Sequence, residues 1–410
     1  MVNQSQSPGK QVWQRFRRNP FAVAGLVVIA AFAIIGILGY LVMPDSTPDA
    51  NRTIYEIRKE PPGFAVDLLK VRNNKPAPSS GIVSKLLFGQ EDSVRWRPFT
   101  NWRYVDDLHI TIDIYGGKGK VKERYALPQI VLPLYPLAGK EHGFNQQHFK
   151  VENNQVIYMN LEKKLDTISL NTVKQRFEEQ HLSRETYLLG TDKSGRDMLS
   201  RLILGTRVSL SIGLITVLIS LVIGVSFGAV AGFFGGMTDQ FLLWFISVLW
   251  SVPRIMLVIA ISLAIQTKGI TVAFTAIGLT MWVEMARVVR GQIMEVKEKL
   301  YIEAAKAIGI SNVRIIFRHM LPNLLGPLIV VMTASFAEAI LVEAGLSFLG
   351  MSVQPPTPSW GLMVNEGYSF ITSKNGWHMI MFPALCISLV VLSFNLSGNG
   401  LRDAVDPKSS

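Results

Sequence analysis

Few residues in this chain have the types and spacing that chemistry requires. The six histidines show no metal-ligand spacing, and the single cysteine, Cys386, excludes a disulfide or a cysteine-based metal site within one chain. A phosphate loop of the form Gly-x-x-x-x-Gly-Lys-Ser/Thr is absent, because the nearest candidate, Gly190 to Gly195, is followed by Arg196. The pattern predicts no catalytic site, no metal, no bound cofactor and no ATP hydrolysis by this chain.

Two charged residues stand within long apolar runs, where charge is expensive and has either a functional or a pairing role. Arg254 and Glu338 are these residues. They could line a translocation path, with Arg254 attracting a solute carboxylate, or they could pair with each other and hold a helical bundle together. Structural pairing is the favoured interpretation.

The elements that would position these charges are membrane-spanning helices. The chain has 410 residues, of which 49% are hydrophobic and 17% charged, against roughly 25% charged in soluble proteins. Several windows lack any charge over the length of about 20 residues that a spanning helix needs. We therefore predict an all-α polytopic membrane protein with six transmembrane helices, near 21–43, 207–231, 240–265, 270–289, 324–345 and 379–397.

The basic residues predict the orientation of these spans. Lysine and arginine concentrate in the N-terminal tail and in the segment 290–323, whereas the loop between spans five and six has only Lys374. Basic residues near span ends remain on the cytoplasmic side. Both termini and the segment 290–323 are therefore expected to be cytoplasmic, and the net charge of +11 indicates topology rather than nucleic-acid binding.

A polar segment, 44–185, separates the first two spans. It contains the proline-rich stretch 75–78 and alternating runs at 109–114 and 156–159, which are typical of half-buried strands. Span parity places it outside the cytoplasm. We expect an inserted extracytoplasmic domain of α+β or mainly β structure.

The segment 186–206 is expected to form a short helix along the outer membrane interface. Ser194 and Asp197 fit a loose capping box. Arg196, Arg201 and Arg207 could reach lipid head groups.

Residues 301–323 are the most informative stretch. Tyr301, Ala304, Ala305 and Ile308 recur with helical spacing and predict a narrow apolar face. Gly309 can end that helix, and Pro322 marks a break before the fifth span. Periodicity alone leaves two interpretations open: an element that docks into another protein, or an amphipathic linker on the membrane surface.

This stretch resembles the EAA loop of bacterial ABC-importer permeases, with Glu303-Ala304-Ala305, Gly309 and Leu321-Pro322 in the expected order. The chain as a whole is similar to the C-type permease subunit of dipeptide, oligopeptide and nickel importers over residues 10–43 and 187–408. Further marks are 189–197, Gly235-Gly236 with Asp239, 286–291, 346–350, 355–361 and 400–407. The long insert departs from the family pattern.

The resemblance implies a type I ABC importer permease fold in the bacterial cytoplasmic (inner) membrane. It implies a heterodimer with a second permease subunit, two cytoplasmic ATPases that hold ATP and Mg, and an extracytoplasmic solute-binding protein that delivers peptides. The residues expected to couple to the ATPases are Tyr301, Glu303, Ala304, Ala305, Gly309, Leu321 and Pro322. An outer gate or interface would involve Asp192, Gly195, Arg196 and Asp197.

The implied organisation has six parts: a cytoplasmic tail (1–20), the first span (21–43), the insert (44–185), the interfacial helix (186–206), the five-helix core with its coupling loop 290–323 (207–397) and a cytoplasmic tail (398–410). Alternatives are a permease of the same family for a nickel chelate or glycoside, and a membrane-anchored extracytoplasmic binding module. A self-sufficient transporter is disfavoured because no internal repeat is evident. A membrane-embedded enzyme is disfavoured because no nucleophile–base pattern appears.

Overall fold

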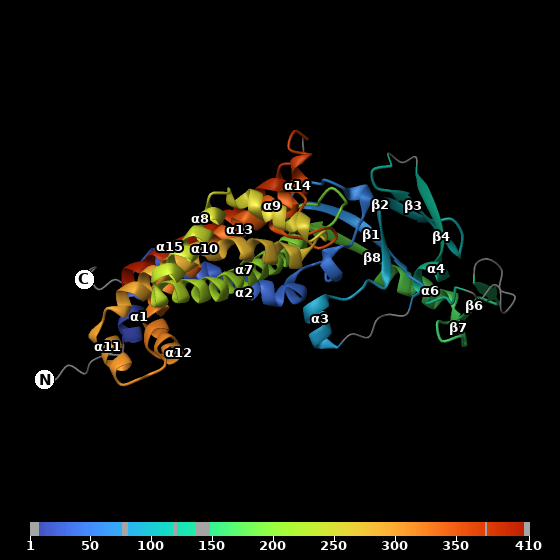
Figure 1. The fold of residues 1–410 in the computed structure, drawn as a ribbon. Coiled ribbons are helices and arrows are strands. Elements are labelled where there is room, and N and C mark those ends of the chain that lie inside the picture. Colours follow the sequence, from blue (N-terminus) through green and yellow to red (C-terminus); the bar gives the residue numbers. More distant parts are fainter. Residues whose placement is uncertain (1–7, 76–80, 118–120, 137–147, 374, 406–410) are drawn as a thin grey trace. The chain divides into compact units, whose positions relative to one another are not determined.

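The computed structural model describes residues 8–75, 81–117, 121–136, 148–373 and 375–405. Lys374, most of the proline-rich stretch 75–78, and the two chain ends at 1–7 and 406–410 lie outside the described residues. The chain divides into two compact units (Figure 1). The helical unit comprises residues 1–37, 204–365 and 380–410, and the β-rich unit comprises residues 38–203 and 366–379.

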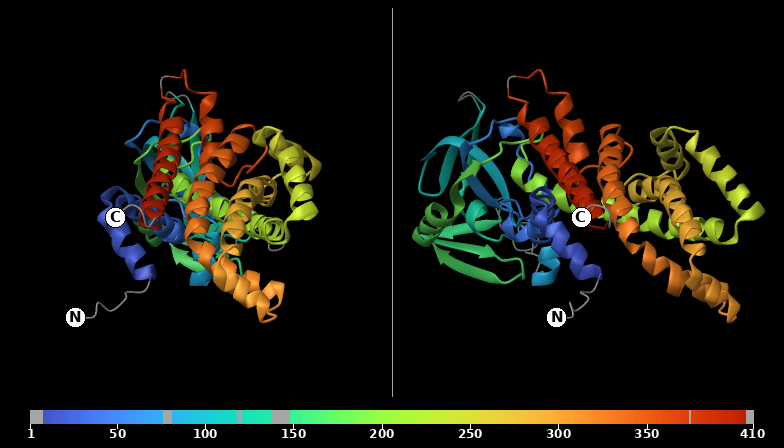
Figure 2. Two further views of the ribbon diagram at one scale, coloured as in Figure 1. Left: turned by 60° about the vertical axis from the view of Figure 1, so that its left-hand side comes forward. Right: turned by 90° about the vertical axis from the view of Figure 1, so that its left-hand side faces the viewer.

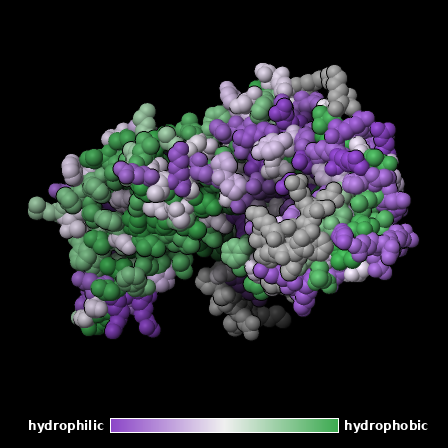
Figure 3. Space-filling model, turned by 90° about the vertical axis from the view of Figure 1, so that its right-hand side faces the viewer, coloured by the Kyte–Doolittle hydropathy of each residue, from purple (hydrophilic) through white to green (hydrophobic). Residues whose placement is uncertain are grey.

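Long apolar helices build the helical unit, and apolar side chains cover the face of it seen in Figure 3. Five described helices are long and apolar enough to cross a membrane, and the bent pair α8–α9 would bring the number to six. The helices are α1 Pro8–Arg18, α2 Pro20–Val42, α7 Met198–Phe234, α8 Gly236–Trp250, α9 Arg254–Ala264, α10 Ile270–Lys297, α11 Leu300–Ala307, α12 Asn312–Arg314, α13 Leu325–Phe348, α14 Trp360–Tyr368 and α15 His378–Val405.

The predicted third span, 240–265, is not one straight helix. It breaks at Ser251–Pro253, and α8 and α9 meet at 90°. Proline lacks a backbone N–H and disfavours helical geometry at the residue before it. Arg254 therefore begins a new helix instead of lying in the middle of a continuous span.

Glycines let α7 pack closely against α10 (Figure 2). Gly224, Gly228 and Gly232 recur every four residues on one face of α7, and a Cβ on Gly228 would lie 2.5 Å from the carbonyl oxygen of Ala286. Small residues at such spacing allow two helix backbones to approach, which is how helices associate where the surrounding solvent is itself apolar.

The β-rich unit contains two antiparallel sheets. The larger sheet has the strand order β4-β3-β2-β1-β8 and the smaller one β5-β6-β7. Both alternating runs are strands as predicted, and in β3 the side chains of Ile110, Ile112 and Ile114 all face the core. The strands are β1 Phe64–Arg72, β2 Val94–Tyr104, β3 His109–Ile114, β4 Lys122–Ala126, β5 Phe149–Glu152, β6 Gln155–Met159, β7 Leu165–Ser169 and β8 Leu182–Tyr187.

Short helices complete this unit. Leu127, Ile130 and Phe177 bring helical turns onto the core of the larger sheet. The helices are α3 Ile82–Phe88, α4 Leu127–Val131 and α6 Leu170–Arg176, followed by a π-helical turn at Phe177–His181.

The prediction of a separate helix at 186–206 is wrong, although residues 198–206 are helical and lead into the second span. Strand β8 runs to Tyr187, a turn follows, and α7 then continues without interruption from Met198 to Phe234. Asp197, rather than Ser194, caps this helix: its Oδ2 accepts hydrogen bonds from the backbone N of Ser200 at 2.8 Å and from its hydroxyl at 2.5 Å.

Candidate functional site: the coupling segment and two ion clusters

The coupling segment, residues 300–324, is a helical hairpin at one end of the helical unit (Figures 1 and 2). Helix α11 ends in a tight turn at Gly309, whose φ is +80°. The N–H of Ile310 donates to the carbonyl of Ala305 and that of Gly309 to Lys306, which is the Schellman arrangement. The left-handed conformation there explains why glycine occupies the position.

The inner face of the hairpin is anchored to α10. Ile302, Ala305 and Ile315 are buried in one apolar cluster with Val289 and Ile293. The side chain of Asn323 adds hydrogen bonds to the hydroxyl of Tyr301 at 3.1 Å and the carbonyl of His319 at 2.7 Å. The segment is therefore held firmly on its spans.

The outer side of the hairpin exposes large apolar side chains among charged ones, which are Glu303, Lys306, Arg314 and Arg318. Ile308 is 76% exposed and Phe317 68%, and Leu300, Tyr301 and Val313 share this exposure. We call these five residues the coupling face. Exposed large apolar side chains indicate a protein or membrane contact. Phe317 also lines an apolar groove with Val222 of α7 and Leu325 of α13.

The structure divides the predicted coupling residues between the two faces. Tyr301, Ala304 and Ile308 are exposed, whereas Ala305 is buried, so the predicted apolar stripe of the helix is not one continuous surface. Ala305 lies three residues after Ile302, on the same face of α11, and both side chains pack against α10. The other predicted coupling residues are exposed or half-buried: Glu303, Gly309, Leu321 and Pro322.

The break predicted at Pro322 is only a change of helix type. A π-helical turn at Ile315–Met320 and a 3₁₀ turn at Leu321–Leu324 lead directly into α13. Proline is accommodated at the first turn of the 3₁₀ segment, where its missing N–H costs no bond. The hairpin is thus connected to α13 by a continuous helical path.

Helix α1 and the end of α15 lie at the same end of the helical unit as this hairpin (Figure 1). Phe16, Ala22 and Ala404 form one small apolar cluster. A Cβ on Gly326, in the first turn of α13, would contact Val405. The starts of α2 and α13 and the end of α15 therefore meet.

A second constellation, which we call the buried ion network, lies in the β-rich unit. Its four charged groups, Asp192, Arg196, Arg201 and Glu366, are each at most 6% exposed. Arg196 donates from Nε to Asp192 at 2.6 Å and from Nη2 to Glu366 at 3.1 Å. Arg201 contacts both carboxylates at 3.4 Å. Opposite charges alternate, so the network is neutral, as burial requires.

The predicted outer-gate residues therefore point inward. Asp192 and Arg196 belong to the buried ion network, and the expectation that Arg196 and Arg201 reach lipid head groups is wrong because carboxylates hold them inside the protein. Gly195 has φ +74°, and a Cβ there would overlap the carbonyl oxygen of Ile54 at 1.8 Å. Burial raises the pKa of Asp197, and the hydrogen bonds from Ser200 oppose that shift.

A third cluster joins three helices of the helical unit. Arg254, at the start of α9, forms ion pairs with Glu338 of α13 and, at 3.2 Å, with Glu284 of α10. The favoured pairing of Arg254 with Glu338 is confirmed. The cluster has two carboxylates for one guanidinium, and Glu284 and Glu338 remain about half exposed.

Sequence reasoning missed two features. The first is Glu366: no local pattern indicated its ion-pair partners, Arg201 and Arg196, which precede it by 165 and 170 residues. The hydrogen bonds of Glu343, which is fully buried, are the second: its carboxylate accepts from Ser347 at 2.7 Å and from Ser209 at 3.3 Å. No group of three or more metal-ligating side chains occurs in the part of the chain that the structure describes.

Two family models match parts of this chain. Residues 224–410 match the family described as binding-protein-dependent transport system inner membrane component. Residues 7–62 match the N-terminal TM domain of oligopeptide transport permease C.

Individual relatives agree with these matches. The dipeptide transport system permease protein DppC of Bacillus subtilis is 41% identical over 239 residues, which is 58% of this chain and 74% of the relative. The oligopeptide permease OppC of the same organism is 39% identical over 53% of this chain and 71% of its own length. The glutathione permease GsiD of Pectobacterium atrosepticum is 40% identical over 54% and 72%.

Among solved structures, the MetNI methionine ABC transporter matches with a TM-score of 0.42 and 18% identity, over 51% of this chain and 98% of that chain. The two family matches cover the first span and the helical unit from residue 224 onward. This chain belongs to the family of inner-membrane components of binding-protein-dependent transport systems.

Proposed function

We propose that this chain is the permease subunit of an ATP-driven importer that moves peptides across the bacterial cytoplasmic membrane. The relatives at about 40% identity are permeases for dipeptides, oligopeptides and glutathione. The observation that carries the mechanism is the coupling face: an exposed apolar surface on a hairpin whose other face is anchored to α10.

The coupling face is the contact for one of two partner ATPases, which bind ATP and Mg, and the second permease subunit supplies the contact for the other. A ligand shifts a conformational equilibrium only through different contacts with the two states. The rigid turn at Gly309 and the continuous helical path into α13 allow movement of an ATPase to displace the spans. In this mechanism the hairpin of this chain transmits the movement to the spans, and the ATPases supply the free energy.

The orientation follows from charge. The hairpin, α1 and the end of α15 lie at one end of the helical unit, and α1 carries Arg15, Arg17 and Arg18. Basic residues at span ends favour the cytoplasmic side. Both termini and the coupling segment are therefore cytoplasmic, and the β-rich insert lies outside the membrane on the opposite side.

The insert then extends the surface on which a solute-binding protein or the second permease subunit docks. Its hydrophilic exterior (Figure 3) fits an aqueous location. The buried ion network links Glu366 to Arg196 and Arg201, before and within the first turn of α7. We therefore assign Asp192, Gly195, Arg196 and Asp197 a role in the outer gate or interface. Deleting the insert while retaining full uptake would reject the docking role.

The cluster of Arg254, Glu338 and Glu284 is a candidate for the solute path. Its half-exposed carboxylates lie within the spans, where uncompensated charge is expensive. An Arg254→Leu variant that assembles normally and transports every peptide at the wild-type rate would confine this cluster to a packing role.

The coupling proposal is tested by Ile308→Ser and Phe317→Ser in tagged chain purified from the native host. Both side chains are exposed, so the expected change in the free energy of unfolding is within about 0.5 kcal/mol. We expect less co-purifying ATPase and loss of peptide uptake, with the second permease subunit retained. Val83→Ser, at a residue of the insert with 69% exposure, is the matched control. Wild-type ATPase recovery in both coupling variants would refute the contact.

A further inference from the structure

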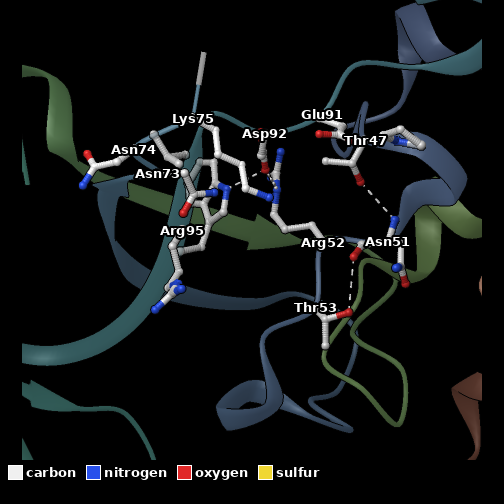
Figure 4. A pocket seen from close by; sticks show the side chains of 13 residues that line it. Thr47, Asn51, Arg52, Thr53, Asn73, Asn74, Lys75, Glu91, Asp92 and Arg95 are labelled. Atoms are coloured by element: carbon white, nitrogen blue, oxygen red, sulfur yellow. Dashed lines mark hydrogen bonds and ion pairs between the residues drawn. The ribbon is translucent and has the colours of Figure 1, made fainter. Parts of the chain in front are cut away.

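The β-rich unit contains a polar cavity that the permease function does not require (Figure 4). Its volume is about 730 Å³, which lies within the range of roughly 300–1,000 Å³ typical of small-molecule sites. Three segments line it: residues 47–53, the end of β1 with Asn73–Lys75, and the start of β2 with Val94–Trp96. Glu91 and Asp92 complete the lining.

One wall of the cavity is already ordered. The guanidinium of Arg52 lies over the ring of Trp96 at 4.3 Å and donates from Nε to Asp92 at 2.9 Å. The indole N–H of Trp96 donates to the same carboxylate oxygen at 2.7 Å. Arg52 also pairs with Asp45 at 3.8 Å, so this wall is formed before any ligand binds. The other charged side chains of the lining, Lys75, Arg95 and Glu91, are exposed.

The remaining charges are Lys75, Arg95 and Glu91. Among the described residues, no hydrogen bond or ion pair engages their side chains. Figure 4 shows Arg95 with Asn73 at one end of the site and Glu91 beside Thr47 at the other, with Arg52 between them. The cavity therefore offers positive charge at one end and negative charge at the opposite end.

We propose that this cavity binds a short zwitterionic solute, a peptide of a few residues. Its carboxylate lies at Arg95 and Lys75, where guanidinium and ammonium groups form charge-assisted hydrogen bonds. Its ammonium group lies at Glu91. The side-chain amides of Asn73 and Asn74 contact the backbone between the two ends.

The cavity is also one hydrogen bond from the buried ion network. Asn51, which lines it, accepts a hydrogen bond through Oδ1 from Nη1 of Arg196 at 3.3 Å. Solute bound beside Asn51 would therefore be connected, through Asn51, to Arg196 in the turn before α7. The site inference rests on the proposed function only for its choice of a peptide as the solute.

The test is calorimetric titration of the purified full-length chain in nanodiscs with trialanine, N-acetyl-trialanine and trialanine amide. We expect saturable binding of trialanine, and about tenfold weaker binding of the amide, because one charge-assisted pair is lost. Arg95→Gln should weaken trialanine binding by the same factor and leave amide binding unchanged. Glu91→Gln should likewise weaken the binding of trialanine by about tenfold and leave the binding of N-acetyl-trialanine unchanged.

Arg103→Gln is the matched control, because Arg103 is exposed on the same strand, β2, and does not line the cavity. It should bind trialanine like the wild type. The proposal is overturned if trialanine does not bind saturably, if Arg95→Gln binds it normally, or if Arg103→Gln loses as much. Binding by the chain alone involves no ATPase, so a failure here leaves the importer role standing, and a failed ATPase recovery leaves this site standing.

Discussion

Removing one member of the buried ion network should be among the most destabilising single changes in the β-rich unit. In Arg201→Met, Asp192 and Glu366 lose a fully buried guanidinium that contacts both at 3.4 Å. Arg196 can neutralise only one of the two carboxylates, and Lys193 approaches Glu366 from a position that is 40% exposed. One carboxylate is left buried without full compensation, which costs about 3–5 kcal/mol.

The cost converts into a measurable shift of the melting temperature. One kcal/mol corresponds to about 2–4 °C for a unit of 150–250 residues, so Arg201→Met should lower the melting temperature by roughly 6–20 °C. Glu366→Gln should act similarly, since two arginines would then face one carboxylate. The double variant restores neutrality, and its loss should be smaller than the sum of the two single losses by at least about 1 kcal/mol.

Thermal unfolding of the detergent-purified chain, followed by size-exclusion recovery, measures these shifts. Lys174→Met is the control, because the pair of Lys174 with Asp107 has a good distance of 2.7 Å but an Asp107 side chain that is 88% exposed. Exposed pairs contribute only about 0–1 kcal/mol. If Arg201→Met melted no lower than Lys174→Met, the reasoning that burial makes this network indispensable would be refuted.

Three further predictions concern single positions. Gly228→Leu should separate α7 from α10 and abolish recovery of folded chain. Gly291→Ala should be recovered at the wild-type level, because a Cβ at Gly291 would meet no atom within 4 Å. Equal recovery of the two variants would contradict the close packing of α7 against α10. Gly309→Ala has room for its methyl group but must keep φ at +80°, at a cost of roughly 1–2 kcal/mol, so hydrogen exchange should quicken in α11 and not in β3. Burial lowers the pKa of His181, so the unfolded chain binds a proton more readily than the folded one. The β-rich unit should therefore lose stability as the pH falls below about 6.5. In a series of melting curves at different pH values, His181→Phe should remove this part of the pH dependence.

Much of the helical and strand content was predictable because it depends on local chemistry. Charge-free windows must enter an apolar environment whatever their partners, so α2 and α10 begin within one residue of their predicted starts. Alternation of apolar residues likewise predicted β3 without knowledge of its neighbours. The turn at Gly309 followed from glycine's freedom in the left-handed region.

The sequence by itself thus determined that the chain has long apolar helices, that 109–114 is a strand and that a helix ends at Gly309, because hydropathy and backbone preference act over a few neighbouring residues. Only the tertiary structure decided that Ala305 faces inward, that Arg196 and Arg201 are buried beside Glu366, and that Arg95 and Glu91 line one cavity. Those outcomes depend on which distant segments meet, and the free energy of a buried charge is set by its partners in space rather than by its neighbours along the chain.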